Sequence, residues 1–102
     1  MNKSTQLIRN NDNGQIAAFD VGGARIGVAT ARTDVKLAKP FDTFLNNGQI
    51  WQKLEEFLKQ EQITQVIIGL PRGLDGQETD QTRITRIFAD EFKRRFDLPI
   101  AF

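Results

Sequence analysis

The chain has 102 residues, enough for one small domain and too few for a second hydrophobic core. Its 14 basic and 13 acidic residues nearly balance, so the overall charge neither predicts nor excludes binding to a polyanion. The sequence contains no cysteine and no histidine, which excludes disulfides, thiolate zinc sites and every catalytic arrangement that needs a thiol or an imidazole. Carboxylates, lysines, hydroxyls and backbone amides are left for any chemistry.

The first 14 residues are polar and rich in asparagine, and we expect them to form a flexible tail before a single domain at residues 15–102. They lack the apolar core of a signal peptide. No apolar segment elsewhere approaches the roughly 20 residues that a membrane-spanning helix needs. The simplest prediction is a cytoplasmic protein that does not contact a membrane.

Short apolar runs in the first half of the chain predict three extended segments, at residues 16–21, 25–31 and 38–44. Gly22 and Gly23 separate the first two, so we expect a tight turn and an antiparallel hairpin. Pro40 cannot donate a backbone hydrogen bond, which places the third segment at an edge of the sheet. Asn46 and Asn47 then provide candidate caps for a helix.

The second half of the chain alternates helices and strands. Apolar residues recur at helical spacing from residue 50 to 60 and predict an amphipathic helix. The continuous apolar run at residues 65–70 predicts a strand buried on both faces and parallel to an earlier strand. A second helix is expected from about residue 79 to 96, and its predicted inner face consists of Ile84, Ile87, Phe88 and Phe92. Residues 100–102 begin a last strand.

The order of these elements predicts the topology of the sheet. Crossovers between parallel strands are almost always right-handed, which places the fourth strand beside the first. The predicted architecture is an α/β fold with one mixed sheet in the order 3-2-1-4-5 and flanking helices. The carboxyl ends of the first and fourth strands then lie side by side, where ligands of open α/β sheets bind.

Asp20 is the one carboxylate in the first apolar strand. Removing an ionised carboxylate from water is unfavourable unless it is paired, hydrogen-bonded or bound to a metal. Two interpretations are equally supported by this stretch: Asp20 accepts hydrogen bonds from the amides of Gly22 and Gly23, or it is a metal ligand.

The predicted topology brings further acidic residues to the same edge. Asp75 follows the fourth strand, with Glu78 and Asp80 close behind it. Carboxylates brought together repel one another unless a cation neutralises them, and Mg²⁺ or Mn²⁺ suits an all-oxygen site. Metal-assisted hydrolysis of a phosphodiester is therefore a reaction that this composition permits. The alternatives are a turn at Asp75-Gly76, and helix-dipole acids at Glu78 and Asp80.

Three arginines are candidates for binding a nucleic-acid backbone: Arg25 after the glycine turn, Arg72 in the loop after the fourth strand, and Arg83 early in the second helix. The alternative for Arg25 is an ion pair with a carboxylate, which we favour. The alternative for Arg83 is a solvated helix surface.

Two motifs resemble the YqgF/RuvX family of Holliday-junction-resolvase-like proteins. The first is Phe19-Asp20-Val21-Gly22 with Arg25-Ile26-Gly27-Val28-Ala29, and the second is Ile68-Gly69-Leu70-Pro71 with Asp75-Gly76 and Thr82. The resemblance covers roughly residues 16–102. It implies an RNase H-like fold, with Asp20 and Asp75 as catalytic, metal-binding residues. It also implies a nuclease that acts on structured ribosomal RNA, in 16S rRNA 5′-end maturation, or on branched DNA such as a Holliday junction, with ribosomal particles as partners.

The chain departs from the family pattern at its end. The family continues after the fifth strand into an Asp-Glu-Arg motif and a further helix, whereas this sequence ends at Phe102. We therefore expect the C-terminal helix and at least one metal-binding carboxylate to be missing. Because a missing helix would uncover one face of the sheet, marginal stability or self-association is also predicted.

Two other classes of function compete with a nuclease. A non-catalytic module of the same fold could bind ribosomal RNA or a protein, and the missing acidic motif favours it. A nucleotide-binding fragment of the actin and sugar-kinase superfamily would share the Asp-x-Gly hairpin. The chain is too short for the two lobes of such kinases, so this third hypothesis ranks last.

Overall fold

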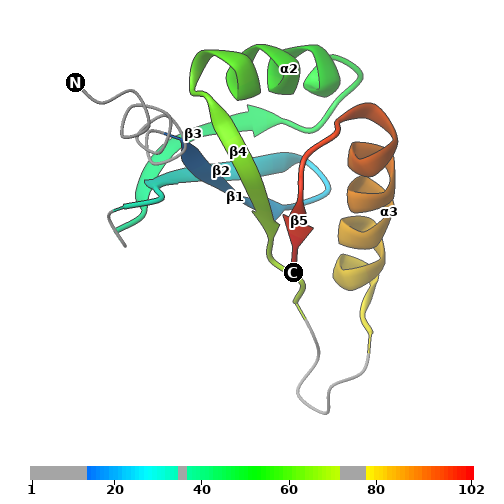
Figure 1. Cartoon of the computed structure of the whole chain (residues 1–102). Helices are drawn as coiled ribbons and strands as arrows, with labels where there is room; N and C mark the ends of the chain where they lie inside the picture. The colour runs from blue at the N-terminus through cyan, green and yellow to red at the C-terminus, as the bar shows by residue number, and fades with distance from the viewer. Residues whose placement is uncertain (1–13, 35–36, 72–77) are drawn as a thin grey trace, which may run out of the picture.

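The computed structural model describes residues 14–34, 37–71 and 78–102 (Figure 1). Within these ranges, five strands and two helices follow one another: β1 (Gln15–Val21), β2 (Arg25–Arg32), β3 (Lys39–Leu45), α2 (Ile50–Gln60), β4 (Ile63–Ile68), α3 (Asp80–Arg95) and β5 (Ile100–Ala101). The expected tail lies outside the described residues except for Gly14, which is buried against Thr64. No helix in the described ranges has the length and apolar character needed to cross a membrane.

The strands form one mixed sheet in the order β3-β2-β1-β4-β5, which confirms the predicted α/β topology. β1 and β2 form the expected antiparallel hairpin, in which Val21 pairs with Ile26. β4 runs parallel to β1, and Phe19 pairs with Ile68 where the two strands end. Pro40 lies in β3 at one edge of the sheet, as its missing N–H requires.

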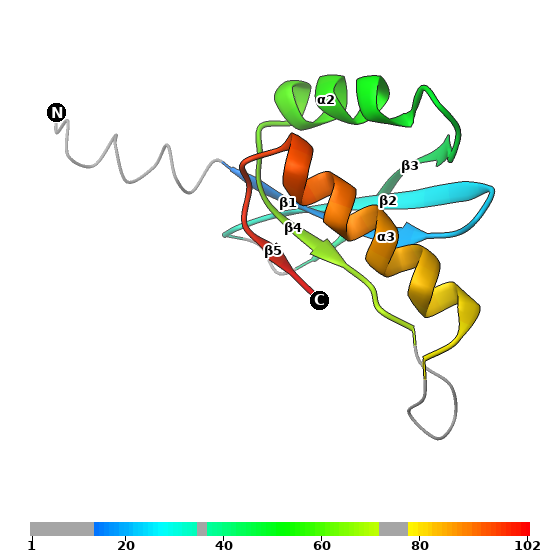
Figure 2. The same cartoon turned by 90° about the vertical axis from the view of Figure 1, so that its right-hand side faces the viewer.

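Both helices pack on the same face of the sheet. Phe19 of β1 contacts Phe57 of α2 and also Phe88 and Phe92 of α3, with ring centroids 5.8 to 6.3 Å apart. In Figure 2, α3 crosses in front of β1 and β2. This aromatic cluster is the centre of the hydrophobic core. Trp51 closes the core between the helices by stacking on Phe88, with ring centroids 5.0 Å apart.

The packing of both helices on one face corrects two expectations about burial. β4 was predicted to be buried on both faces, but Ile67 is 38% exposed because no described element covers the other face. Ile84 and Ile87 were predicted on the inner face of α3, but they are 36% and 62% exposed. The helix instead turns Phe88, Phe92 and the small, fully buried Thr85 toward the sheet, which leaves the two isoleucines to one side.

Candidate active site

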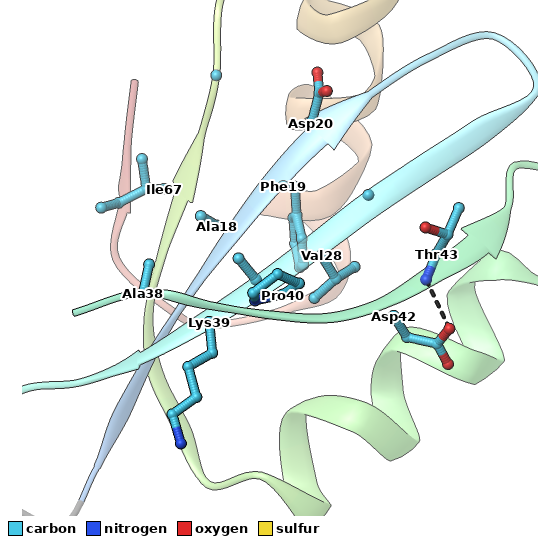
Figure 3. A pocket seen from close by; sticks show the side chains of 13 residues that line it. Ala18, Phe19, Asp20, Val28, Ala38, Lys39, Pro40, Asp42, Thr43 and Ile67 are labelled. Carbon is cyan, nitrogen blue, oxygen red and sulfur yellow. Dashed lines mark hydrogen bonds between the residues drawn. The ribbon is translucent and has the colours of Figure 1, made fainter.

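Asp20 lies at the carboxyl end of β1 on the face of the sheet that neither helix covers. Its neighbours in the strand, Phe19 and Val21, point into the core, so the alternation of a strand turns Asp20 outward. Its side chain is exposed, and Figure 3 shows the carboxylate standing clear of the other labelled side chains. The expectation that Asp20 is a carboxylate in apolar surroundings is therefore wrong. The apolar residues beside it in the sequence belong to the opposite face.

Glycines occupy both positions beside Asp20 in the sheet. Gly27 of β2 is its partner in the antiparallel register. Gly69 follows the last parallel pair, and its amide donates a 3.0 Å hydrogen bond to the carbonyl of Phe19. A glycine allows another molecule to come close to the backbone. Within the described residues, no side chain on either neighbouring strand therefore flanks the carboxylate of Asp20, a feature that the sequence alone did not suggest.

The turn after Asp20 does not use its carboxylate. The amide of Gly22 donates to the carbonyl of Arg25 at 2.8 Å, and no hydrogen bond joins the Asp20 side chain to another described residue. The turn-residue interpretation of Asp20 is therefore not supported within the described part of the chain. Gly22 is required for another reason, because a Cβ atom there would lie 2.9 Å from the Arg25 carbonyl oxygen.

Three carbonyls around this turn accept hydrogen bonds from distant parts of the chain. The side chain of Gln81, in the first turn of α3, donates to the carbonyl of Val21. Asn46 donates twice, from its side-chain Nδ2 to the carbonyl of Gly22 at 2.7 Å and from its backbone N–H to that of Ala24 at 2.9 Å. The sequence predicted Asn46 as a candidate helix cap, but Asn46 binds the turn and the N-cap residue of α2 is Gln49. Only the tertiary fold brings these partners together, so no sequence signal could have found them.

The first turn of α3 begins beside the end of β4. Thr79 caps the helix, and its side chain and that of Thr82 form a reciprocal capping box. The Thr82 hydroxyl also donates to the carbonyl of Pro71, just after β4. The predicted site residues Arg72 and Asp75 belong to the segment 72–77, which lies outside the described residues.

The acidic residues at the start of α3 pair with arginines of the same helix. Asp80 accepts a 2.9 Å hydrogen bond from Arg83, and Glu78 lies 3.3 Å from Arg86. The side chains of Arg83 and Asp80 are 67% and 91% exposed, so this ion pair contributes little stability. The structure thus favours a role for Glu78 and Asp80 at the helix start over metal binding.

Arg25 is exposed at the first position of β2. The register places it on the same side of the hairpin as Asp20, one diagonal step away, where neighbouring residues are typically about 7–8 Å apart. The expected ion pair with a carboxylate is not formed with any residue in the described ranges. Its guanidinium therefore has no carboxylate partner in the described part of the chain.

A shallow hollow of about 580 Å³ extends from Asp20 across the uncovered face toward β3 (Figure 3). Small and apolar side chains form most of its floor, among them Ala18, Ala29, Pro40 and Ile67. The hollow exists because these strands present small residues outward and large residues to the helices.

The donor chemistry of Asp20 suits a divalent cation. Mg²⁺ and Mn²⁺ bind oxygen ligands, and one or two carboxylates with water are sufficient to hold them beside a phosphate. Within residues 14–34, 37–71 and 78–102, however, no group of three or more acidic side chains is arranged to hold a metal ion. Asp20 thus fits such an ion as one ligand.

The chain matches one family model and several curated proteins. The model of the RuvX family, described as Holliday junction resolvase, matches residues 14–102. A protein of Sulfurihydrogenibium named "Putative pre-16S rRNA nuclease" is 33% identical over 90 residues, covering 86% of this chain and 62% of that protein. A protein of the same name from Pectobacterium carotovorum is 39% identical over 88 residues, covering 84% and 63%. The chain therefore spans slightly less than two thirds of these curated relatives.

Among solved structures, the Lmo2764 protein of Listeria monocytogenes, titled "a putative N-acetylmannosamine kinase", aligns with 85% of this chain and 34% of its own. The identity is 20% and the TM-score is 0.48, values that support no conclusion about function.

Proposed function

Because the chain belongs to the RuvX family of Holliday junction resolvases, we propose that it forms the cleaving part of a metal-dependent nuclease with Asp20 at the reaction centre. The observation that supports this most directly is the position of Asp20. It is an exposed carboxylate at the adjoining ends of two parallel strands, between Gly27 and Gly69. The names of the relatives suggest precursor 16S ribosomal RNA as the substrate, and the family description suggests branched DNA.

In this proposal the carboxylate of Asp20 holds Mg²⁺ or Mn²⁺, and Asp75 is the proposed second ligand. Such an ion, when bound, lowers the pKa of a coordinated water and neutralises charge on a phosphate. In this proposal Asp20 fixes the position of the ion at the end of β1. Because Gly27 and Gly69 have no side chains, a phosphodiester can reach the carboxylate from either flank.

The arginines provide the positive charge that a nucleic-acid backbone needs in this proposal. Arg25 lies on the same side of the hairpin as Asp20 and has no ion pair with a described residue. Arg83 is held only by an exposed pair with Asp80. With Arg72, they are the proposed phosphate-binding residues, and they position the substrate without reading its sequence.

Cleavage of two substrates tests this proposal: an RNA spanning the precursor 5′ end of 16S rRNA, and a four-way DNA junction. With Mn²⁺ or Mg²⁺ present, we expect the wild type to cleave at least one of them and EDTA to stop the reaction. Asp20→Asn should reduce the rate by more than about 100-fold, because an amide cannot replace an anionic metal ligand. Asp90→Asn, at an exposed position of α3, is the control and should cleave like the wild type.

Equal cleavage by the wild type and Asp20→Asn would contradict the proposal. Binding of the RNA that survives both EDTA and Asp20→Asn, without cleavage, would indicate the non-catalytic binding module instead. Association with ribosomal particles and a cytoplasmic location stay predictions. Self-association through the uncovered face also stays a prediction, which sedimentation velocity at several protein concentrations tests.

A further inference from the structure

After Phe19, β1 pairs with β2 but no longer with β4. β4 pairs with β1 only as far as Phe19 and Ile68, with one further hydrogen bond from the amide of Gly69. From Asp20 to the turn at Gly22, β2 is the only described strand that pairs with β1, and Val21 is the last residue of this strand that packs in the core. A two-stranded ribbon is marginally stable by itself. Asp20 therefore stands on a part of the sheet that needs other support to hold its position.

Gln81 supplies part of that support from α3. Its side chain is half-buried and donates to the carbonyl of Val21, the residue directly after Asp20. Its neighbour Thr82 shares the capping box with Thr79 and donates to the carbonyl of Pro71, which ties the helix turn that carries Gln81 to the end of β4. The end of β1, the start of α3 and the exit of β4 are thus linked by side-chain hydrogen bonds.

Asn46 supports the other side of the turn from the segment between β3 and α2. Its side chain and its backbone N–H bind the carbonyls of Gly22 and Ala24, at 2.7 and 2.9 Å. One residue therefore holds both ends of the three-residue connection between the strands. Backbone carbonyls at a turn are otherwise satisfied by water, which does not restrain the chain.

We propose that Gln81 and Asn46 are positioning residues for Asp20, replacing the strand pairing that β1 loses beyond Phe19. They act through the backbone of residues 21–24 and do not touch the substrate. The consequence for the reaction rests on the proposed function, in which Asp20 binds a divalent cation. The support of the turn itself follows from the hydrogen bonds and can be tested separately.

The test uses the full chain and removes each donor without a change in charge. Gln81→Met removes the hydrogen bond to Val21, and Asn46→Ala removes the side-chain hydrogen bond to Gly22. The matched controls are Gln52→Met, at an exposed position of α2, and Asn47→Ala, which breaks only a local bond to the amide of Gln49. Ile63→Val is a third control that lowers stability through the core without touching the turn.

Three quantities are measured for each variant: Mn²⁺ affinity by calorimetry, amide hydrogen exchange of residues 20–24 by NMR, and Tm. We expect Gln81→Met and Asn46→Ala each to weaken Mn²⁺ binding about three- to tenfold, which corresponds to the loss of one hydrogen bond. Exchange of the turn amides should be faster by a similar factor. The Gln52 and Asn47 variants should leave both quantities within about twofold of the wild type.

Two results would overturn the proposal. One is unchanged turn exchange in both Gln81→Met and Asn46→Ala. The other is an equal loss of Mn²⁺ affinity in Ile63→Val at the same Tm, because the effect would then reflect general stability. If Asp20→Asn binds Mn²⁺ as the wild type does, the proposed function fails. The exchange data then decide whether Gln81 and Asn46 hold the turn.

Discussion

The two faces of the sheet differ in what their side chains do, although the same strands form both. Toward the helices, β1 presents Phe19 and Val21, which are 2% and 1% exposed. On the uncovered face it presents Ala18 and Asp20, which lie in or beside the shallow hollow. One step along a strand therefore separates a core aromatic residue from the candidate catalytic carboxylate.

The difference shows how a small domain can keep stability and chemistry apart. Burial of large apolar side chains provides most of the favourable free energy of folding. Among the described residues, these buried side chains lie almost entirely between the sheet and the two helices. The uncovered face contributes little packing and can therefore present glycines beside Asp20. Substitutions on the face that the helices cover should reduce stability, whereas substitutions beside Asp20 on the other face should reduce cleavage.

The largest effect is expected in the core. Phe92 is fully buried and its ring lies 5.8 Å from that of Phe19 and 4.8 Å from that of Phe96. Phe92→Ala should reduce the free energy of unfolding by about 3–5 kcal/mol, enough to unfold a marginal domain. Ile67→Ala on the uncovered face should cost less than about 1 kcal/mol. Chemical denaturation followed by circular dichroism measures both, and equal losses would contradict the division between the faces.

A smaller loss of stability is expected at the turn beside Asp20. Gly22→Ala would place a methyl group 2.9 Å from the backbone carbonyl of Arg25, whereas a Cβ at Gly23 meets no atom within 4 Å. We expect Gly22→Ala to reduce the free energy of unfolding by about 1–3 kcal/mol. The matched Gly23→Ala should stay within about 0.5 kcal/mol of the wild type. Similar values for the two variants would show that the turn adapts and that this close approach is unimportant.

A substitution at Gly27 should change the cleavage rate without a large change in stability. A Cβ at this position would lie 3.8 Å from the Cβ of Asp20, an ordinary contact, so Gly27→Val should fold with a change in stability below about 1 kcal/mol. Its methyl groups would cover one flank of the carboxylate. We expect cleavage to fall by more than about tenfold. Ala31→Val, on the same face farther along β2, is the control, and full activity of Gly27→Val would contradict the proposed access to Asp20.

The smallest effect is expected on the solvent side of α3, which belongs to neither face. Hydrogen bonds from Arg94 and Arg95 lower the pKa of Glu91. Because the folded-state pKa is lowered, the stabilisation is present above the ordinary glutamate pKa of about 4.3 and is lost as the pH falls through the lowered value. Glu91→Gln should lower Tm slightly near pH 7, and the gap should close at strongly acidic pH. A gap that persists in acid would show that the pair is not its cause.

Local patterns were sufficient to predict the elements and their order. The apolar runs predicted β1, β2 and β4, the helical periodicity predicted α2, and Pro40 identified an edge strand, all within a few residues of the observed bounds. The handedness of crossovers then led to the observed strand order. These predictions succeeded because hydrophobic period, turn residues and chain connectivity act over short stretches of sequence.

Burial could not be predicted in the same way. Which face of the sheet the helices cover depends on how both pack together, and this decided that Ile67 and Ile87 are exposed. The same packing decided that Asp20 faces solvent. The sequence left Glu78 and Asp80 as either metal ligands or acidic residues at a helix start. Only the side-chain positions showed that they pair with arginines on α3.

The sequence by itself determined that Asp20 ends a central strand beside the end of a parallel one, because apolar periodicity and crossover handedness require it. Only the tertiary structure decided how that position is held. Gln81 and Asn46 lie 60 and 24 residues from the carbonyls that they bind, and no local pattern relates residues that far apart. Hydrogen bonds of this kind depend on the relative positions of helices and strands, and the packing of the core determines those positions.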